Sequence, residues 1–185
     1  MLVVSALLVM ASAMPGTAAE KWGPFRGQLV DQATGKGIPG AAVIAIWWKN
    51  EPNPIQMNRS FFDATEAVTD TDGRFEIPRY AKPPFFDFQI FLPEITYFAP
   101  GYLPVRKEMT PSDGEPFVVP TVVSMRRFDL SNRIDNLVVS IRGRPGGVPL
   151  RKLTQFTRAI NVERAMRGLT PLPVPGVDFT PSDDD

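Results

Sequence analysis

Any chemistry in this 185-residue chain would have to come from carboxylate, lysine, tyrosine and hydroxyl side chains. The chain has no histidine and no cysteine, which removes imidazole bases, thiolate nucleophiles, disulfides and metal sites built on either side chain. The most acidic motif, TDTDG at residues 69–73, shares the Asp-x-Asp-Gly of a calcium-binding loop. Aligning Gly73 with that loop's glycine places Val68 and Arg79 where the first and last ligands belong, so both anchors are missing. The motif therefore predicts an Asp-Gly hairpin turn, and a calcium site of another geometry is the alternative.

A second motif, GKGIPG at residues 35–40, has the G-x-G-x-x-G spacing of a dinucleotide-binding loop. Such a loop needs a following helix whose N-terminal amides hold the pyrophosphate, whereas the strand-like AAVIAIWW follows here. We therefore predict a turn and no cofactor. Because no carboxylate pair is placed across a cleft, we assign no catalytic residue and no metal ligand, and we expect a protein that is not an enzyme.

Two aromatic pairs are the best candidates for a binding surface. Neighbouring residues on a strand point to opposite faces, so at least one member of each pair should face outward. Exposed aromatic rings stack on sugars or anchor a protein partner, and burial in the core is the alternative. The candidate residues are Trp47, Trp48, Phe61 and Phe62.

Short apolar runs separated by turn residues predict seven strands and a mainly β fold. The expected strands are residues 25–31, 41–49, 64–69, 74–77, 87–92, 105–109 and 117–125. The run AAVIAIWW, residues 41–48, is apolar at every position, so both of its faces need cover: one from the facing sheet and one from outside the sandwich.

A change to helical spacing predicts two C-terminal helices, at residues 131–141 and 149–167. Within an extension spanning residues 126–168, we expect this pair to pack on the sandwich, over the side that carries Trp47 and Trp48. Its arginines form a solvated outer face or, alternatively, meet an anionic polymer or a membrane surface. The tail, residues 169–185, is rich in proline and then acidic, and we expect no structure there.

Residues 1–19 combine an apolar run with a Pro-Gly break and small residues, which predicts a secretory signal. Cleavage after Ala13 and after Ala19 are both compatible with the pattern, and a buried helix is the alternative interpretation. The run is shorter than the roughly 18 to 20 residues of a spanning helix, so the mature chain should lack a transmembrane segment. We expect a periplasmic or extracellular protein. Its formal net charge is +0, which gives no reason to expect a nucleic-acid partner.

Three segments together resemble the carboxypeptidase regulatory-like domain, a small transthyretin-like sandwich of many exported bacterial proteins. They are GQLVDQATGKGIPGAAVIAIW, AVTDTDGRFEIP and FAPGYLPVRKEM, in that order. The resemblance covers residues 25–125 of a domain that we place at residues 20–125, with a longer insert at residues 50–63. It implies a seven-stranded Greek-key β-sandwich, here followed by the pair of α-helices. The family has no shared active site, and enzymes of similar fold need histidines that this chain lacks.

The sequence thus predicts a non-enzymatic exported module that binds a protein partner or a cell-envelope polysaccharide through its exposed aromatic residues. The alternative is a structural or assembly protein that self-associates through its C-terminal helices. Ligand identity and oligomeric state are not encoded in any motif that we recognise.

Overall fold

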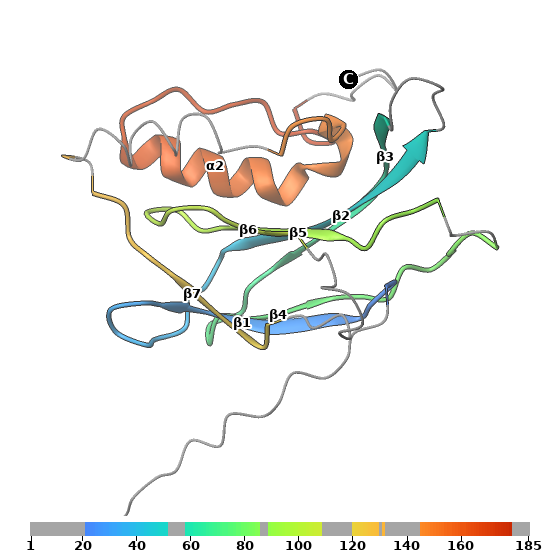
Figure 1. Ribbon diagram of the computed structural model, residues 1–185. Helices are drawn as coiled ribbons and strands as arrows, with labels where there is room; N and C mark the ends of the chain where they lie inside the picture. The colour runs from blue at the N-terminus through green and yellow to red at the C-terminus, as the bar shows by residue number, and fades with distance from the viewer. Residues whose placement is uncertain are drawn as a thin grey trace, which may run out of the picture.

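The computed structural model describes residues 21–51, 58–85, 89–108, 120–129, 131 and 145–178. In this part of the chain, seven strands form two sheets that face each other, and a helix covers the outer face of one sheet (Figure 1). The mainly β fold with seven strands is therefore confirmed. The strands are β1 (Phe25–Asp31), β2 (Ala42–Glu51), β3 (Asn58–Val68), β4 (Arg74–Ile77), β5 (Glu94–Phe98), β6 (Val105–Glu108) and β7 (Val122–Met125). The 3-10 helix η1 (Leu150–Lys152) leads into α2 (Thr154–Met166).

One sheet has the strand order β4-β1-β7 and the other has the order β3-β2-β5-β6. All pairs in both sheets are antiparallel except β1 with β7, which run parallel. The core between the sheets is built from alternate positions of the strands, as expected when one face of each strand is buried. On β4, for example, Phe75 and Ile77 are buried while Arg74 and Glu76 are exposed, which confirms the predicted alternation.

The outer face of the four-stranded sheet carries a second apolar layer. Ile44 and Ile46 of β2 point away from the core between the sheets and pack against Phe156 and Ala159 of α2. The rings of Phe98 on β5 and Phe156 lie 5.4 Å apart. The uniformly apolar β2 is therefore covered on both faces, by the facing sheet and by α2 (Figure 1).

Two carboxylates attach α2 to the rest of the fold, one near each end of the helix. One comes from the sheet and the other from α2 itself. Leu153, at the N-cap, makes no capping hydrogen bond with its side chain. Instead Glu66 of β3 accepts hydrogen bonds from the amides of Gln155 and Phe156, at 2.9 and 2.8 Å, and so satisfies N–H groups that the first helical turn leaves free. Near the other end, the buried Glu163 accepts a 2.6 Å hydrogen bond from the Gly101 amide.

Four of the predicted strands differ in extent from those observed. The strand expected at 87–92 is wrong over its described part, residues 89–92: β5 begins at Glu94, after Pro93, and every residue of EITYF is buried, so it shows no polar alternation. The insert expected at 50–63 is largely strand, because β2 continues to Glu51 and β3 begins at Asn58. The strand expected at 117–125 is described only from residue 120, and its ladder covers Val122–Met125.

The C-terminal prediction is confirmed for one helix only. α2 lies within the helix predicted at 149–167, whereas the helix predicted at 131–141 lies outside the described residues apart from Ser131. Residues 1–19, with the predicted secretory signal, also lie outside them. Within the described residues, no helix is both long enough and apolar enough to cross a membrane.

Residues 169–178, which we call the C-terminal strap, are held to α2 although they belong to the predicted unstructured tail, whose residues 179–185 lie outside the described part of the chain. Asn161 of α2 holds the backbone of Leu172 on both sides, donating to its carbonyl and accepting from its amide at 2.7 Å each. Arg164 donates to the Thr170 carbonyl at 2.6 Å, and Thr154 donates to the Pro175 carbonyl at 3.1 Å. The strap therefore runs back along α2 (Figure 1).

Candidate functional site

The four aromatic residues predicted as a binding surface are divided between two apolar layers. Trp47 is fully buried between the sheets, so Trp48 is the member of this pair that points away from that core. Phe62 is half-buried and also belongs to that side, where it packs against Trp22 and Tyr80. Trp48 and Phe61 pack on the opposite side, within the layer that α2 covers, with their rings 6.2 Å apart.

A β-bulge explains this separation. β2 and β3 pair Trp47 with Asp63 but Trp48 with Phe61, so the register shifts and Phe62 is the extra residue. A bulge re-aims the side chains around it. The bulge and the alternation of β2 together divide the four rings between the two apolar layers. The C-terminal part of the chain covers the Trp48 ring, because a Cβ added at Gly147 would come within 3.2 Å of it.

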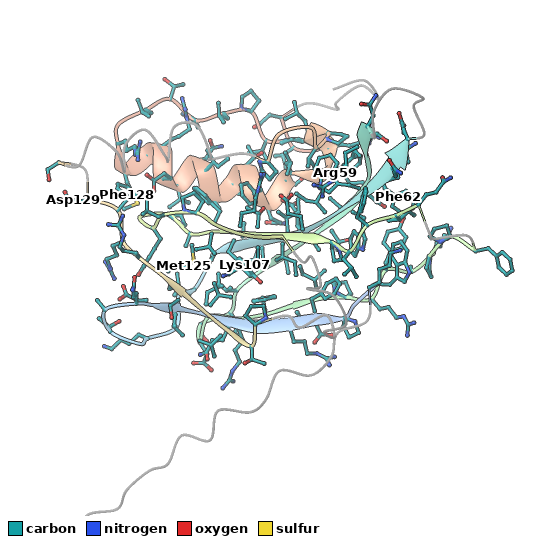
Figure 2. All side chains as sticks on the ribbon, viewed as in Figure 1. Arg59, Phe62, Lys107, Met125, Phe128 and Asp129 are labelled. Carbon is teal, nitrogen blue, oxygen red and sulfur yellow. The ribbon has the colours of Figure 1, made fainter. Side chains whose placement is uncertain are left out.

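At this end of the sheet the exposed side chain of Arg59 lies against two aromatic rings. The guanidinium carbon of Arg59 lies 5.4 Å from the ring centre of Trp48 and 5.3 Å from that of Phe91. Arg59 is exposed, and Phe91 is 37% exposed. Figure 2 shows Arg59 and Phe62 at the same end of the four-stranded sheet. We call Arg59, Trp48 and Phe91 together the Arg59 surface.

Three neighbouring stretches of backbone place these side chains. Arg59 pairs with Asn50 in the β2–β3 ladder, diagonally across from Trp48. The segment before β5 continues along β2 through two hydrogen bonds, from the Phe91 amide to the Trp48 carbonyl (2.8 Å) and from the Asn50 amide to the Gln89 carbonyl (2.7 Å). Hydrogen-bonded backbone thus fixes the Cα positions of all three residues.

The guanidinium of Arg59 has no carboxylate partner within the described part of the chain. The nearest acid in the ladder, Glu51, accepts a hydrogen bond from Ser60 at 2.7 Å and pairs with Lys49 at 3.2 Å. These two contacts, the Ser60 bond first, lower the pKa of the Glu51 carboxyl and keep it ionised. A guanidinium stacked on rings is weakly hydrated and presents a planar fork of donors, which suits carboxylate, phosphate or sulfate groups.

A polar cluster braces the sheet edge beside the bulge. Asp63 accepts a hydrogen bond from the Tyr80 hydroxyl at 2.8 Å and pairs with Lys152 of η1 at 2.7 Å. Burial, together with the bond to Asp63, raises the pKa of Tyr80 to about 12, so its hydroxyl stays protonated at neutral pH. For Asp63, burial is outweighed by the bonds from Lys152 and Tyr80, which lower its pKa. The cluster ties η1 to the sheet.

The TDTDG motif forms the predicted turn, with one correction. One oxygen of Asp70 accepts hydrogen bonds from the amides of Asp72 and Arg74, at 2.9 and 2.8 Å, and Gly73 has φ +76°. The turn is not a hairpin, however, because β3 and β4 belong to different sheets. No group of three or more side chains able to hold a metal ion occurs among the described residues. The motif therefore connects the two layers of the sandwich.

Sequence reasoning missed both Arg59 and Phe91. Arg59 lies in the stretch interpreted as an insert, and Phe91 lies in residues 87–92, which were predicted as a strand of the sandwich and not as part of a site. The spacing of Arg59 and Phe61, two residues apart, would place them on one face of a strand had β3 been recognised. The sequence matches no protein-family model and no curated protein.

Proposed function

We propose that this protein is a non-enzymatic, exported binding module that recognises an acidic cell-envelope polysaccharide through the Arg59 surface. The proposal includes a transthyretin-like fold of the carboxypeptidase regulatory-like type. Two facing sheets of three and four strands support that fold, and so does the packing of the GKGIPG and TDTDG turns described below.

The observation that carries the proposal is the exposed guanidinium of Arg59, held against the Trp48 and Phe91 rings without a described acidic partner. A repeating uronate, phosphate or sulfate supplies the missing anion. The Phe91 edge supplies an apolar contact for the C–H face of the adjoining sugar ring. Charge-assisted, bidentate hydrogen bonds of this kind are stronger than neutral ones.

A polysaccharide fits this surface better than a folded protein does. Within the Arg59 surface, Phe91 is the exposed ring, whereas Trp48 is half-buried and lies beside Gly147. Protein interfaces are organised around a buried, largely apolar core with several aromatic anchors. A single cation against an aromatic edge instead suits a chain that repeats one charged unit.

Binding to polygalacturonate, with neutral dextran as the comparison polymer, tests the proposal. Calorimetry on Arg59→Gln should show roughly a tenfold or greater loss of affinity, the effect of one charged hydrogen-bond partner. Arg59→Lys should fall in between, because lysine keeps the charge but loses the fork. Lys36→Gln, which removes an exposed cation from the β1–β2 turn, is the matched control. Equal binding by wild type and Arg59→Gln, or equal binding of both polymers, would contradict the proposal.

Self-association through the C-terminal helix is the second candidate. It is supported by two exposed apolar side chains of α2, Val162, which is 54% exposed, and Met166, which is 63% exposed. The buried stripe of α2 contributes nothing to this candidate, since the four-stranded sheet already covers it.

A further inference from the structure

The outer face of the three-stranded sheet carries a hollow of about 480 Å³. This face lies on the far side of the molecule from α2 (Figure 1). The hollow crosses β1 and β4 and reaches Asp70 of the TDTDG turn, and its volume falls within the roughly 300–1,000 Å³ of small-molecule sites. The polar side chains that line it come from Arg26, Gln28, Asp70, Arg74, Glu76 and Thr121.

The side chains that line the hollow have a net charge of zero, and some of them are already bonded to one another. Arg26 and Glu76 form a two-point ion pair, with atoms 3.0 and 2.9 Å apart, which makes one wall. The side-chain nitrogen of Gln28, Nε2, donates to the backbone carbonyl of Asp72 at 2.8 Å. This bond orients the side-chain carbonyl of Gln28. Since the two arginines and the two carboxylates balance, the hollow has no electrostatic preference for an ion of either sign.

Several hydrogen-bonding atoms are left over after this pairing. Among the described residues, the second carboxylate oxygen of Asp70 and the hydroxyl of Thr121 have no partner. Arg74 makes only one long side-chain contact, at 3.4 Å to Asp72, so most of its five donors are available. The hollow therefore offers a carboxylate acceptor and guanidinium donors from the same turn, beside a neutral amide and a hydroxyl.

We infer that this hollow binds a neutral sugar ring through two adjacent hydroxyl groups. One hydroxyl donates to Asp70 while its neighbour accepts from Arg74, and Gln28 and Thr121 contact the rest of the ring edge. Val68, which is 45% exposed, supplies the apolar contact for the ring's C–H groups. The site lies on the sheet opposite to the Arg59 surface, so it does not depend on the function proposed there.

Chemical-shift titration of the ¹⁵N-labelled full chain with methyl α-glucopyranoside tests the inference. We expect saturable shifts at millimolar sugar that centre on the amides of residues 28, 70 and 74. Arg74→Gln should weaken binding roughly tenfold, because it removes a charged donor. Thr121→Val, which keeps the side-chain shape, should weaken it less. Arg74 is a suitable position because its side chain is 68% exposed and makes a single weak ion pair, so the variant should keep the wild-type fold and spectrum.

The Arg59→Gln variant is the cross-control, since it should bind methyl α-glucopyranoside like the wild type. The Arg74→Gln variant should in turn bind polygalacturonate like the wild type, so failure of either proposal is separable from failure of the other. Three results would overturn the inference: no saturable shift, equal affinity in Arg74→Gln and wild type, or tighter binding of methyl glucuronide than of the neutral sugar.

Discussion

At the scale of single residues, two glycines explain why the GKGIPG and TDTDG motifs occur together. A Cβ on Gly37 would collide with the Asp72 carbonyl, and a Cβ on Gly73 would collide with the Leu29 carbonyl and come within 2.6 Å of the Ile38 nitrogen. The two turns therefore pack backbone against backbone. The glycines are needed for this close approach rather than for phosphate or calcium binding.

We predict that Gly73→Ala and Gly37→Ala both lower the free energy of unfolding by well over the 1–2 kcal/mol or so that positive φ alone costs. Gly35→Ala is the matched control for Gly73→Ala, because Gly35 has positive φ (+68°) as Gly73 does but no atom within 4 Å of the added Cβ. Urea denaturation compares the three variants. Equal losses in Gly35→Ala and Gly73→Ala would show that backbone conformation, not packing, sets the requirement.

A buried carboxylate joins three segments of the chain. Asp31 accepts hydrogen bonds from Arg127 Nε at 2.7 Å and from the Tyr102 hydroxyl at 2.8 Å, as well as from two amides of its own turn. The bonds from Arg127 and then Tyr102 outweigh the effect of burial and hold the pKa of Asp31 well below its usual range. The folded state therefore favours the ionised carboxylate.

The stabilisation that Asp31 gives to the folded state is fully present above the pKa of an unfolded aspartate, about 3.9, and is lost as the pH falls below it. We predict that Asp31→Asn lowers the urea midpoint at pH 7, and that the difference from wild type narrows as the pH falls below about 4. Urea titrations at several pH values measure both effects. A difference that stays constant down to pH 3 would show that Asp31 acts by packing alone.

At the scale of elements, α2 is held to the sheet by its buried stripe. Phe156 is fully buried against Phe98, so Phe156→Ala should cost about 3–5 kcal/mol, which is the usual price of emptying an aromatic core position. Val162→Ala, on the exposed side of the same helix, should change stability by less than about 0.5 kcal/mol. Denaturation curves give both values. Similar losses in the two variants would mean that α2 is not anchored by this stripe.

The elements that could be predicted from the sequence are those whose apolar and polar pattern is complete within one short segment. Phe75 and Ile77 alternate with charged residues, and AAVIAIWW is apolar throughout, so β4 and the double cover of β2 could be predicted. β5 could not be predicted in the same way, because all five of its residues are buried and the apolar pattern has no period. The strap could not be predicted either, since its order comes from Asn161 binding the backbone eleven positions away, at Leu172.

Of the four aromatic residues predicted as a binding surface, only Trp48 belongs to the Arg59 surface. Alternation placed Trp47 and Trp48 on opposite sides of β2, but it did not show that a helix would cover one side and the second sheet the other. The bulge at Phe62 then depends on the pairing of β2 with β3, which is a property of two strands together. Arg59 becomes a candidate only after both layers are in place.

At the scale of the whole molecule, the chain forms three layers, in which the four-stranded sheet lies between α2 and the three-stranded sheet (Figure 1). Removing residues 145–185 should expose Ile44, Ile46 and Phe98, and we predict that the shortened protein binds a hydrophobic dye and aggregates. Size-exclusion chromatography and dye fluorescence measure this. The full chain is the control, and a shortened protein that remains monomeric and does not bind dye would contradict the prediction.

The parallel pairing of β1 with β7 determines when the three-stranded sheet can form during folding. β1 is the first strand and β7 the last, and their register joins Gln28 to Val122 and Asp31 to Met125. Closing this sheet therefore requires almost the entire sandwich sequence, and the loop-closure entropy must be overcome before any contact of the pair is gained. During synthesis, the antiparallel β2–β3 ladder can form before Met125 has left the ribosome. The central strand of the other sheet, β1, cannot pair with β7 until then.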